Sequence, residues 1–154
     1  MTVFTAPPET PNGPKPPRDE EFPVKRPKAN HVGAPAVFSL ELACQELNRA
    51  FGNKGAGHCY LVGSALDNPD RRDIDIRLML SDEDYDALFP ASAGARYLTH
   101  EGDPRWLIMS IAISKWLSDL CGLPVDFQFQ RQTDANRQHK GRRDAAGMIF
   151  AGDF

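Results

Sequence analysis

Apolar residues recur every three or four positions in two long segments, which predicts two amphipathic helices. The first covers residues 38–51, with Ser39 as its N-cap and Gly52 as its end. The second covers residues 104–122, where Asp103 followed by proline is typical of a helix start. The predicted buried face of this second helix is Trp106, Met109, Ile113, Trp116, Leu117 and Leu120.

Strict alternation of apolar and polar residues predicts two half-buried strands, over residues 72–80 and 124–130. A short aromatic and branched run over residues 58–63 predicts a buried strand, and residues 95–100 favour a weak one. A short helix capped by Ser81 is predicted directly after the strand over residues 72–80. The polar faces of the two alternating strands carry Asp73, Asp75 and Arg77 on one, and Asp126, Gln128 and Gln130 on the other.

This order of elements predicts an α/β fold of the α+β type, with a mixed sheet, helices packed on one face and an open acidic cleft on the other. Nine of the 13 prolines lie before residue 36, so residues 1–35 are expected to form an extended arm. The arm is either a leader without a role or a segment that docks, through Phe22 and Val24, on its own domain or on a partner. Residues 36–130 form the predicted core and residues 131–154 a basic tail.

Composition and charge narrow the class of protein. The chain is 41% hydrophobic and 25% charged, and it has neither an apolar run of about 18 residues nor a signal-peptide pattern. We therefore expect a cytoplasmic protein without membrane association. Residues 37–130 hold 8 Lys and Arg against 14 Asp and Glu. This acidity argues against a protein that coats nucleic acid and suits a site for a divalent cation. Three isolated cysteines are expected to be buried thiols: Cys44, Cys59 and Cys121.

Five residues predict a site for a metal ion and a phosphate group. Asp73 and Asp75 lie two positions apart on one strand face, about 6–7 Å from each other. Asp126, on a second strand of the same sheet, can complete a cluster whose mutual repulsion a cation would relieve. Magnesium favours such oxygen ligands. Gly63 and Ser64 end the preceding strand in a turn whose N–H groups suit an anion.

These motifs resemble the nucleotidyltransferase superfamily that includes DNA polymerase β, and in particular its small single-domain members. The resemblance covers residues 60–130, from the Gly-Ser pair through "DIDIRL" to "VDF". The resemblance implies that two Mg²⁺ ions orient a nucleoside triphosphate such as ATP. A hydroxyl of a protein, an RNA or a small molecule would then accept the nucleoside monophosphate, and pyrophosphate would leave. The resemblance assigns the metals and catalysis to Asp73, Asp75 and Asp126, and the phosphates to Gly63 and Ser64.

Nearby basic residues have two interpretations each. Arg77 shares the aspartate face, where it either contacts a phosphate or forms a salt bridge that disperses the acidic charge. Arg72 is either loop charge or a contact for the triphosphate or the acceptor. A basic group in the tail forms a weak phosphate or RNA footprint, although such charges often only keep a tail soluble: Arg137, His139, Lys140, Arg142 and Arg143.

The sequence leaves two other functions open. The connection over residues 65–72 is shorter than is typical of the family, so one alternative is a catalytically inactive member. Such a protein would bind or assemble with a partner through its proline-rich arm. A metal-dependent nuclease also uses clustered acids, but it does not explain the Gly-Ser turn.

Overall fold

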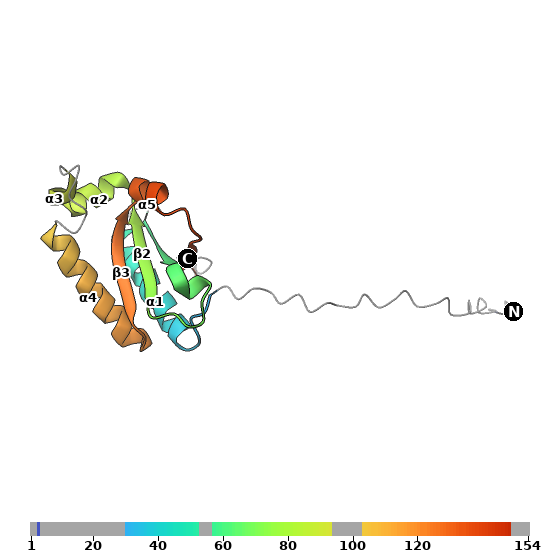
Figure 1. Ribbon diagram of the computed structural model, residues 1–154. Helices are drawn as coiled ribbons and strands as arrows, with labels where there is room; N and C mark the ends of the chain where they lie inside the picture. The colour runs from blue at the N-terminus through green and yellow to red at the C-terminus, as the bar shows by residue number, and fades with distance from the viewer. Residues whose placement is uncertain (1–2, 4–29, 53–56, 94–102, 149–154) are drawn as a thin grey trace.

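A computed structural model describes residue 3 and residues 30–52, 57–93 and 103–148, and the description below refers to these residues. They form one mixed sheet with helices, as the predicted fold class requires (Figure 1). The strands are β1 (His58–Val62), β2 (Ile74–Leu80), β3 (Val125–Arg131) and β4 (Asp144–Ala146). The helices are α1 (Ala36–Phe51), the 3₁₀ turn η1 (Gly63–Leu66), α2 (Asp82–Leu88), α3 (Pro90–Ala93), α4 (Pro104–Cys121) and α5 (Gln132–Gln138).

The sheet order is β3-β2-β1-β4, with β1 antiparallel to both neighbours and β2 parallel to β3. The predicted alternation of faces in β2 and β3 is confirmed. The apolar positions of the two strands are buried: Ile74, Ile76, Leu78, Leu80, Val125, Phe127 and Phe129. This register fixes which polar side chains share the opposite face.

The helices α1 and α4 contact each other and cover the apolar face of the sheet, with α1 against β1 and β4 and α4 against β3 (Figure 1). Phe129 joins the layers, because its ring lies 5.1 Å from that of Phe51, 5.2 Å from that of Phe89 and 5.0 Å from that of Phe127. Truncating such a buried ring costs about 3–5 kcal/mol. This packing holds β3, and with it the polar face of the sheet, in place.

The free edge of β3 is covered by polar side chains of α4. Three of them bond to the backbone of β3: Ser118 Oγ accepts from Val125 N (2.9 Å), Ser114 Oγ accepts from Phe127 N (2.9 Å) and Trp106 Nε1 donates to Phe129 O (3.0 Å). These side chains satisfy backbone groups that the edge of a sheet would otherwise leave without a partner. The helix therefore fixes the position of β3 along its length as well as covering it.

Helix ends follow the sequence with one exception. Ser81 caps α2, Asp103 caps α4, and α4 ends at Gly122, which has a left-handed φ of 74°. The prediction that Ser39 caps the first helix is wrong, because α1 begins at Ala36 with Pro35 at the N-cap position. Proline presets a helical φ and has no N–H that needs a partner, so the helix starts earlier.

The predicted buried face of α4 is partly wrong. Trp106 and Leu117 are buried, but Trp116 is 41% exposed and Leu120 48% exposed. The helix is apolar nearly all round, so its periodicity does not indicate which side meets the sheet. The edge contacts of β3 select the side instead, since they turn the serines of α4 inward. Among the described helices, none is long and apolar enough to cross a membrane.

The segment after β3 contains more structure than its sequence indicates. The expected helical turn is α5, but β4 was not predicted, and it pairs with β1. A three-residue strand is too short to show alternation. Cys44 and Cys59 are buried as expected, while Cys121 is partly exposed. The possible strand at 95–100 and residues 4–29 of the arm lie outside the described residues.

Candidate functional site

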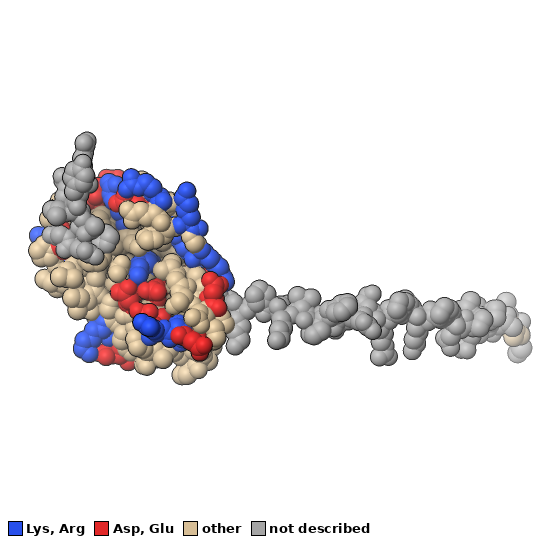
Figure 2. All heavy atoms as spheres, in the orientation of Figure 1, with Lys and Arg blue, Asp and Glu red and all other residues tan. Residues whose placement is uncertain are grey.

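The face of the sheet opposite α1 and α4 carries mostly polar side chains. The register places them in three rows across β1, β2 and β3: Val62, Asp75 and Asp126; Tyr60, Arg77 and Gln128; His58, Met79 and Gln130. A groove of about 490 Å³ lies over this face, between the strands and residues 138–143. In Figure 2, acidic side chains gather near the centre of this face and basic ones along its upper right edge.

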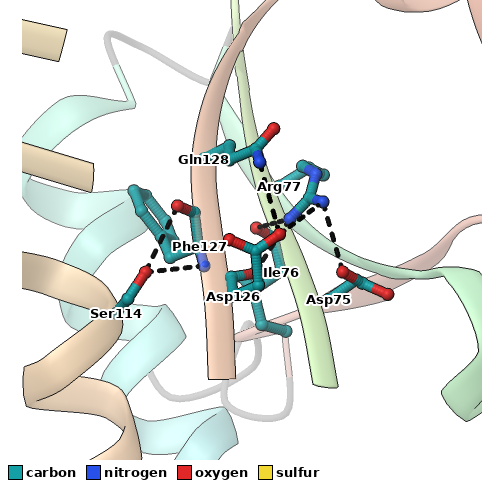
Figure 3. A network of polar contacts seen from close by, with 7 residues as sticks. All are labelled: Asp75, Ile76, Arg77, Ser114, Asp126, Phe127 and Gln128. Atoms are coloured by element: carbon teal, nitrogen blue, oxygen red, sulfur yellow. Dashed lines mark hydrogen bonds and ion pairs between the residues drawn. The ribbon is translucent and has the colours of Figure 1, made fainter. Parts of the chain in front are cut away.

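Arg77 lies between the two aspartates of adjacent strands (Figure 3). Its Nη2 is 3.2 Å from Asp75 Oδ1 and 2.9 Å from Asp126 Oδ2, and its Nη1 donates to the backbone oxygens of Ile76 (3.1 Å) and Asp126 (2.8 Å). Gln128 also donates to Asp126 Oδ2, at 3.3 Å. The side chain of Arg77 is only 12% exposed. The salt bridge expected for Arg77 is therefore present, and the guanidinium is held by two carbonyls as well as by the acids.

Burial raises the pKa of Asp75 above its ordinary value. The charge of Arg77 opposes this shift, whereas the charges of Asp73 and Asp126 add to it. The pKa of Asp75 thus remains raised even beside a guanidinium. A cation with a higher charge than Arg77, placed at the same carboxylate, would favour the ionised form more strongly.

Gly63 follows β1 and begins η1 beside Asp75. Its φ is +74°, and a Cβ at this position would collide with Asp75 Oδ2. Glycine adopts this backbone conformation without strain, and here it also leaves room for the carboxylate. The position of the Asp75 carboxylate is therefore enough to explain why glycine occupies position 63. The predicted approach of a phosphate to this turn is a second explanation.

The predicted site residues are only partly brought together. Gly63, Asp75 and Arg77 line the groove, and Asp126 is the partner of Asp75 across the β2–β3 pair. Asp73 precedes β2 and is exposed. Ser64 and Arg72 are also exposed, and neither they nor Asp73 are among the described residues that line the groove.

The carboxylates suit a magnesium ion in chemistry, but they do not form a closed cluster. Over the described residues, no group of three or more His, Cys, Asp or Glu side chains lies close enough together to hold a metal ion. Arg77 bonds to one oxygen of each aspartate, and it takes neither Asp75 Oδ2 nor Asp126 Oδ1. These two oxygens are of the kind that magnesium binds, but in Figure 3 they point away from each other. Asp75 and Asp126 therefore offer one carboxylate oxygen each and form no closed site for a magnesium ion among the described residues.

The groove has a second wall that the sequence did not indicate, residues 138–143. Arg143 attaches this segment to the sheet and to α5, with Nη1 at 3.3 Å from Met79 Sδ and 2.8 Å from Asn136 Oδ1. Its Nη2 donates to the carbonyls of Ala135 (2.8 Å) and His139 (2.7 Å). The basic group in the tail was the signal that could have found this wall, although its place over the sheet was not predictable.

Comparisons with known proteins found no family model that matches the chain, and no curated protein or solved structure that matches it. Function is therefore inferred from the groove and its side chains.

Proposed function

We propose that the groove binds a nucleoside triphosphate such as ATP with Mg²⁺ and transfers its nucleoside monophosphate to a hydroxyl of a protein, an RNA or a small molecule, releasing pyrophosphate. The observation that supports this proposal is the pairing of Asp75 with Asp126 across adjacent strands, beside the Gly63 turn. A volume of about 490 Å³ also falls within the usual range for small-molecule sites, about 300–1,000 Å³.

Each site residue has a defined part in this proposal. Asp75 and Asp126 would hold the magnesium, with Asp73 as a further carboxylate at the entrance to β2. When bound, the metal supplies neutralisation of the charge on the phosphate oxygens. Asp126, whose side chain is 40% exposed, orients the acceptor hydroxyl and accepts its proton. The backbone at Gly63 and Ser64 meets the phosphates, and Arg72 adds positive charge at the edge.

A second candidate is a catalytically inactive binding or assembly module with the same fold. The observation that favours it is Arg77, whose guanidinium pairs with both Asp75 and Asp126 and offsets one of their two negative charges without a metal ion. A well-bonded guanidinium that is 12% exposed is a stable part of the structure, since moving it would leave two partly buried acids without a counter-charge. In this case the carboxylates would hold Arg77 and would take no part in chemistry.

Binding and transfer measurements separate the two candidates. Titration calorimetry with each ribonucleoside triphosphate and Mg²⁺ measures binding, and transfer of an α-phosphate label to lysate components measures the reaction. Asp75→Asn and Asp126→Asn should lose transfer. Asp119→Asn is the matched control, because Asp119 is exposed and lies on α4, away from the groove. If the wild-type protein neither binds any triphosphate nor transfers label, nucleotidyl transfer is excluded.

The assembly function has its own measurement. Size-exclusion chromatography with light scattering, on the protein purified with its partners, should show a complex that is lost when residues 1–29 are deleted. Ending the deletion at residue 29 keeps Val32, which is buried in the core. Asp75→Asn would leave such a complex intact, and its loss in that variant would contradict assembly through the arm.

A further inference from the structure

The side chains that line the groove include more cations than carboxylates. The protein has a net charge of −3, yet among the described residues that line the groove only Asp75 is acidic. The basic residues of the lining are Arg77, Lys140, Arg142 and Arg143. Arg77 is paired with Asp75 and Asp126, and Arg142 with Asp144 and Asp67. Lys140 and Arg143 have no carboxylate partner among the described residues, so the excess of positive charge in the lining lies in residues 138–143. Concave walls of one sign concentrate ligands of the opposite charge.

This wall is held in a fixed position. The four hydrogen bonds of Arg143 join the wall to β2 and to α5, and also to the carbonyl of His139 within the wall. The wall is followed directly by β4, which pairs with β1. The segment is therefore anchored at both ends to the sheet. The side chain at position 140 is presented to the groove by an ordered backbone, so less conformational entropy is lost when a ligand binds.

One cation of the wall is available to a ligand. Within the described part of the chain, the ammonium of Lys140 makes no hydrogen bond and no ion pair, and the residue is exposed. Arg142 is held by Asp144, with Nε at 3.0 Å from Oδ1 and Nη2 at 2.8 Å from Oδ2, and it lies 3.7 Å from Asp67. A bidentate pair keeps the guanidinium in place, so the donor that is open to a ligand is Lys140. The amide of Gln130, on the floor of the groove, adds a neutral hydrogen-bond donor.

We propose that Lys140 and the amide of Gln130, beside Arg143, form an anion subsite that takes a phosphate group, at the wall of the groove made by residues 138–143. The inference deepens the proposed function and rests on it only for the source of that phosphate. The source is either the triphosphate of the nucleotide or a phosphate of an RNA acceptor. A phosphate oxygen accepts hydrogen bonds from ammonium and amide groups alike, and Lys140 and Gln130 supply these donors.

The test uses inorganic tripolyphosphate and a short single-stranded RNA, each titrated into the full-length protein without Mg²⁺. Lys140→Gln removes one charge at an exposed position, so the variant is expected to fold. Lys115→Gln is the matched control, since Lys115 is 76% exposed on α4 in the helical layer. We expect the affinity for the ligand that supplies the phosphate to fall about fivefold in Lys140→Gln, an effect that added salt reduces, and to stay unchanged in the control.

Each outcome has a defined meaning. If Lys140→Gln loses affinity for tripolyphosphate alone, the subsite is assigned to the phosphates of the nucleotide. If it loses affinity for RNA, alone or together with tripolyphosphate, the subsite also accepts a phosphate of an RNA acceptor. Equal affinities of the wild type and Lys140→Gln for both probes overturn the proposal, as does the absence of binding by the wild type. Asp75→Asn separates this proposal from nucleotidyl transfer, because the variant should lose transfer while still binding the anion.

Discussion

Replacing Arg77 with methionine removes the positive charge between Asp75 and Asp126 while keeping much of the volume of the side chain. The variant loses the two ion pairs at 3.2 Å and 2.9 Å and the two hydrogen bonds to backbone carbonyls. The carboxylates then face each other across neighbouring strands without a counter-charge. The removal of Arg77 therefore changes the electrostatics of the groove directly.

The expected loss of stability lies between two limits. Breaking a fully buried ion pair costs about 3–5 kcal/mol, and breaking an exposed one costs about 0–1 kcal/mol. Arg77 is nearly buried, but Asp75 is 21% exposed and Asp126 is 40% exposed, so water screens both carboxylates in part. We therefore expect a decrease of about 2 kcal/mol in the free energy of unfolding near neutral pH.

The decrease should depend on pH. The charge of Arg77 lowers the pKa of Asp75, so its removal raises that pKa further above the ordinary value. A carboxyl group whose pKa is higher in the folded than in the unfolded protein favours folding at low pH, and this contribution is lost as the pH rises through the folded pKa. The difference between wild type and Arg77→Met should therefore be small at about pH 4 and larger at about pH 7.

Urea unfolding at both pH values, with and without about 10 mM Mg²⁺, measures these effects. If the carboxylates can hold a metal, Mg²⁺ should stabilise Arg77→Met by about 2.7 kcal/mol at a hundredfold excess over its Kd, and should stabilise the wild type less. Lys115→Met, exposed on α4, is the control for the loss of a positive charge. A variant as stable as the wild type, and indifferent to pH and to Mg²⁺, would refute the assigned role of Arg77.

Three further changes test other contacts of the site and its frame. Ser114→Ala leaves the buried N–H of Phe127 without an acceptor, so urea unfolding should show a loss of about 1–3 kcal/mol. Gly63→Ala places a Cβ against the carboxylate of Asp75 in a left-handed conformation. Transfer activity should therefore fall even at temperatures where the variant is still folded. Burial alone would raise the pKa of Asp82, but hydrogen bonds from Thr133 in the first turn of α5 and the charge of Arg131 outweigh it and lower this pKa. Its contribution is therefore lost as the pH falls through that lowered pKa, and Asp82→Asn should reduce the pH dependence of the melting temperature in acid.

The elements that the sequence predicted correctly depend on local repeats. In β2 and β3 every second residue must face the core, so alternation alone identified the buried positions and the polar face that carries Asp75 and Asp126. The ends of α2 and α4 were also predictable, because a capping side chain acts on backbone groups only two or three residues away. The proposed nucleotidyl transfer and its magnesium remain predictions.

Contacts between distant segments were decided only by the tertiary structure. The parallel register of β2 and β3 sets Asp126 beside Asp75, and a shift of one residue would have turned either side chain into the core. That register also lets Arg77 reach both acids. The buried side of α4 follows from its hydroxyl contacts with the edge of β3, which no helical period contains. The wall at residues 138–143 lies over the sheet because Arg143 bonds to Met79, which is 64 positions away in the sequence. Local periodicity therefore determined which side chains are polar and outward, and long-range pairing determined which of them meet.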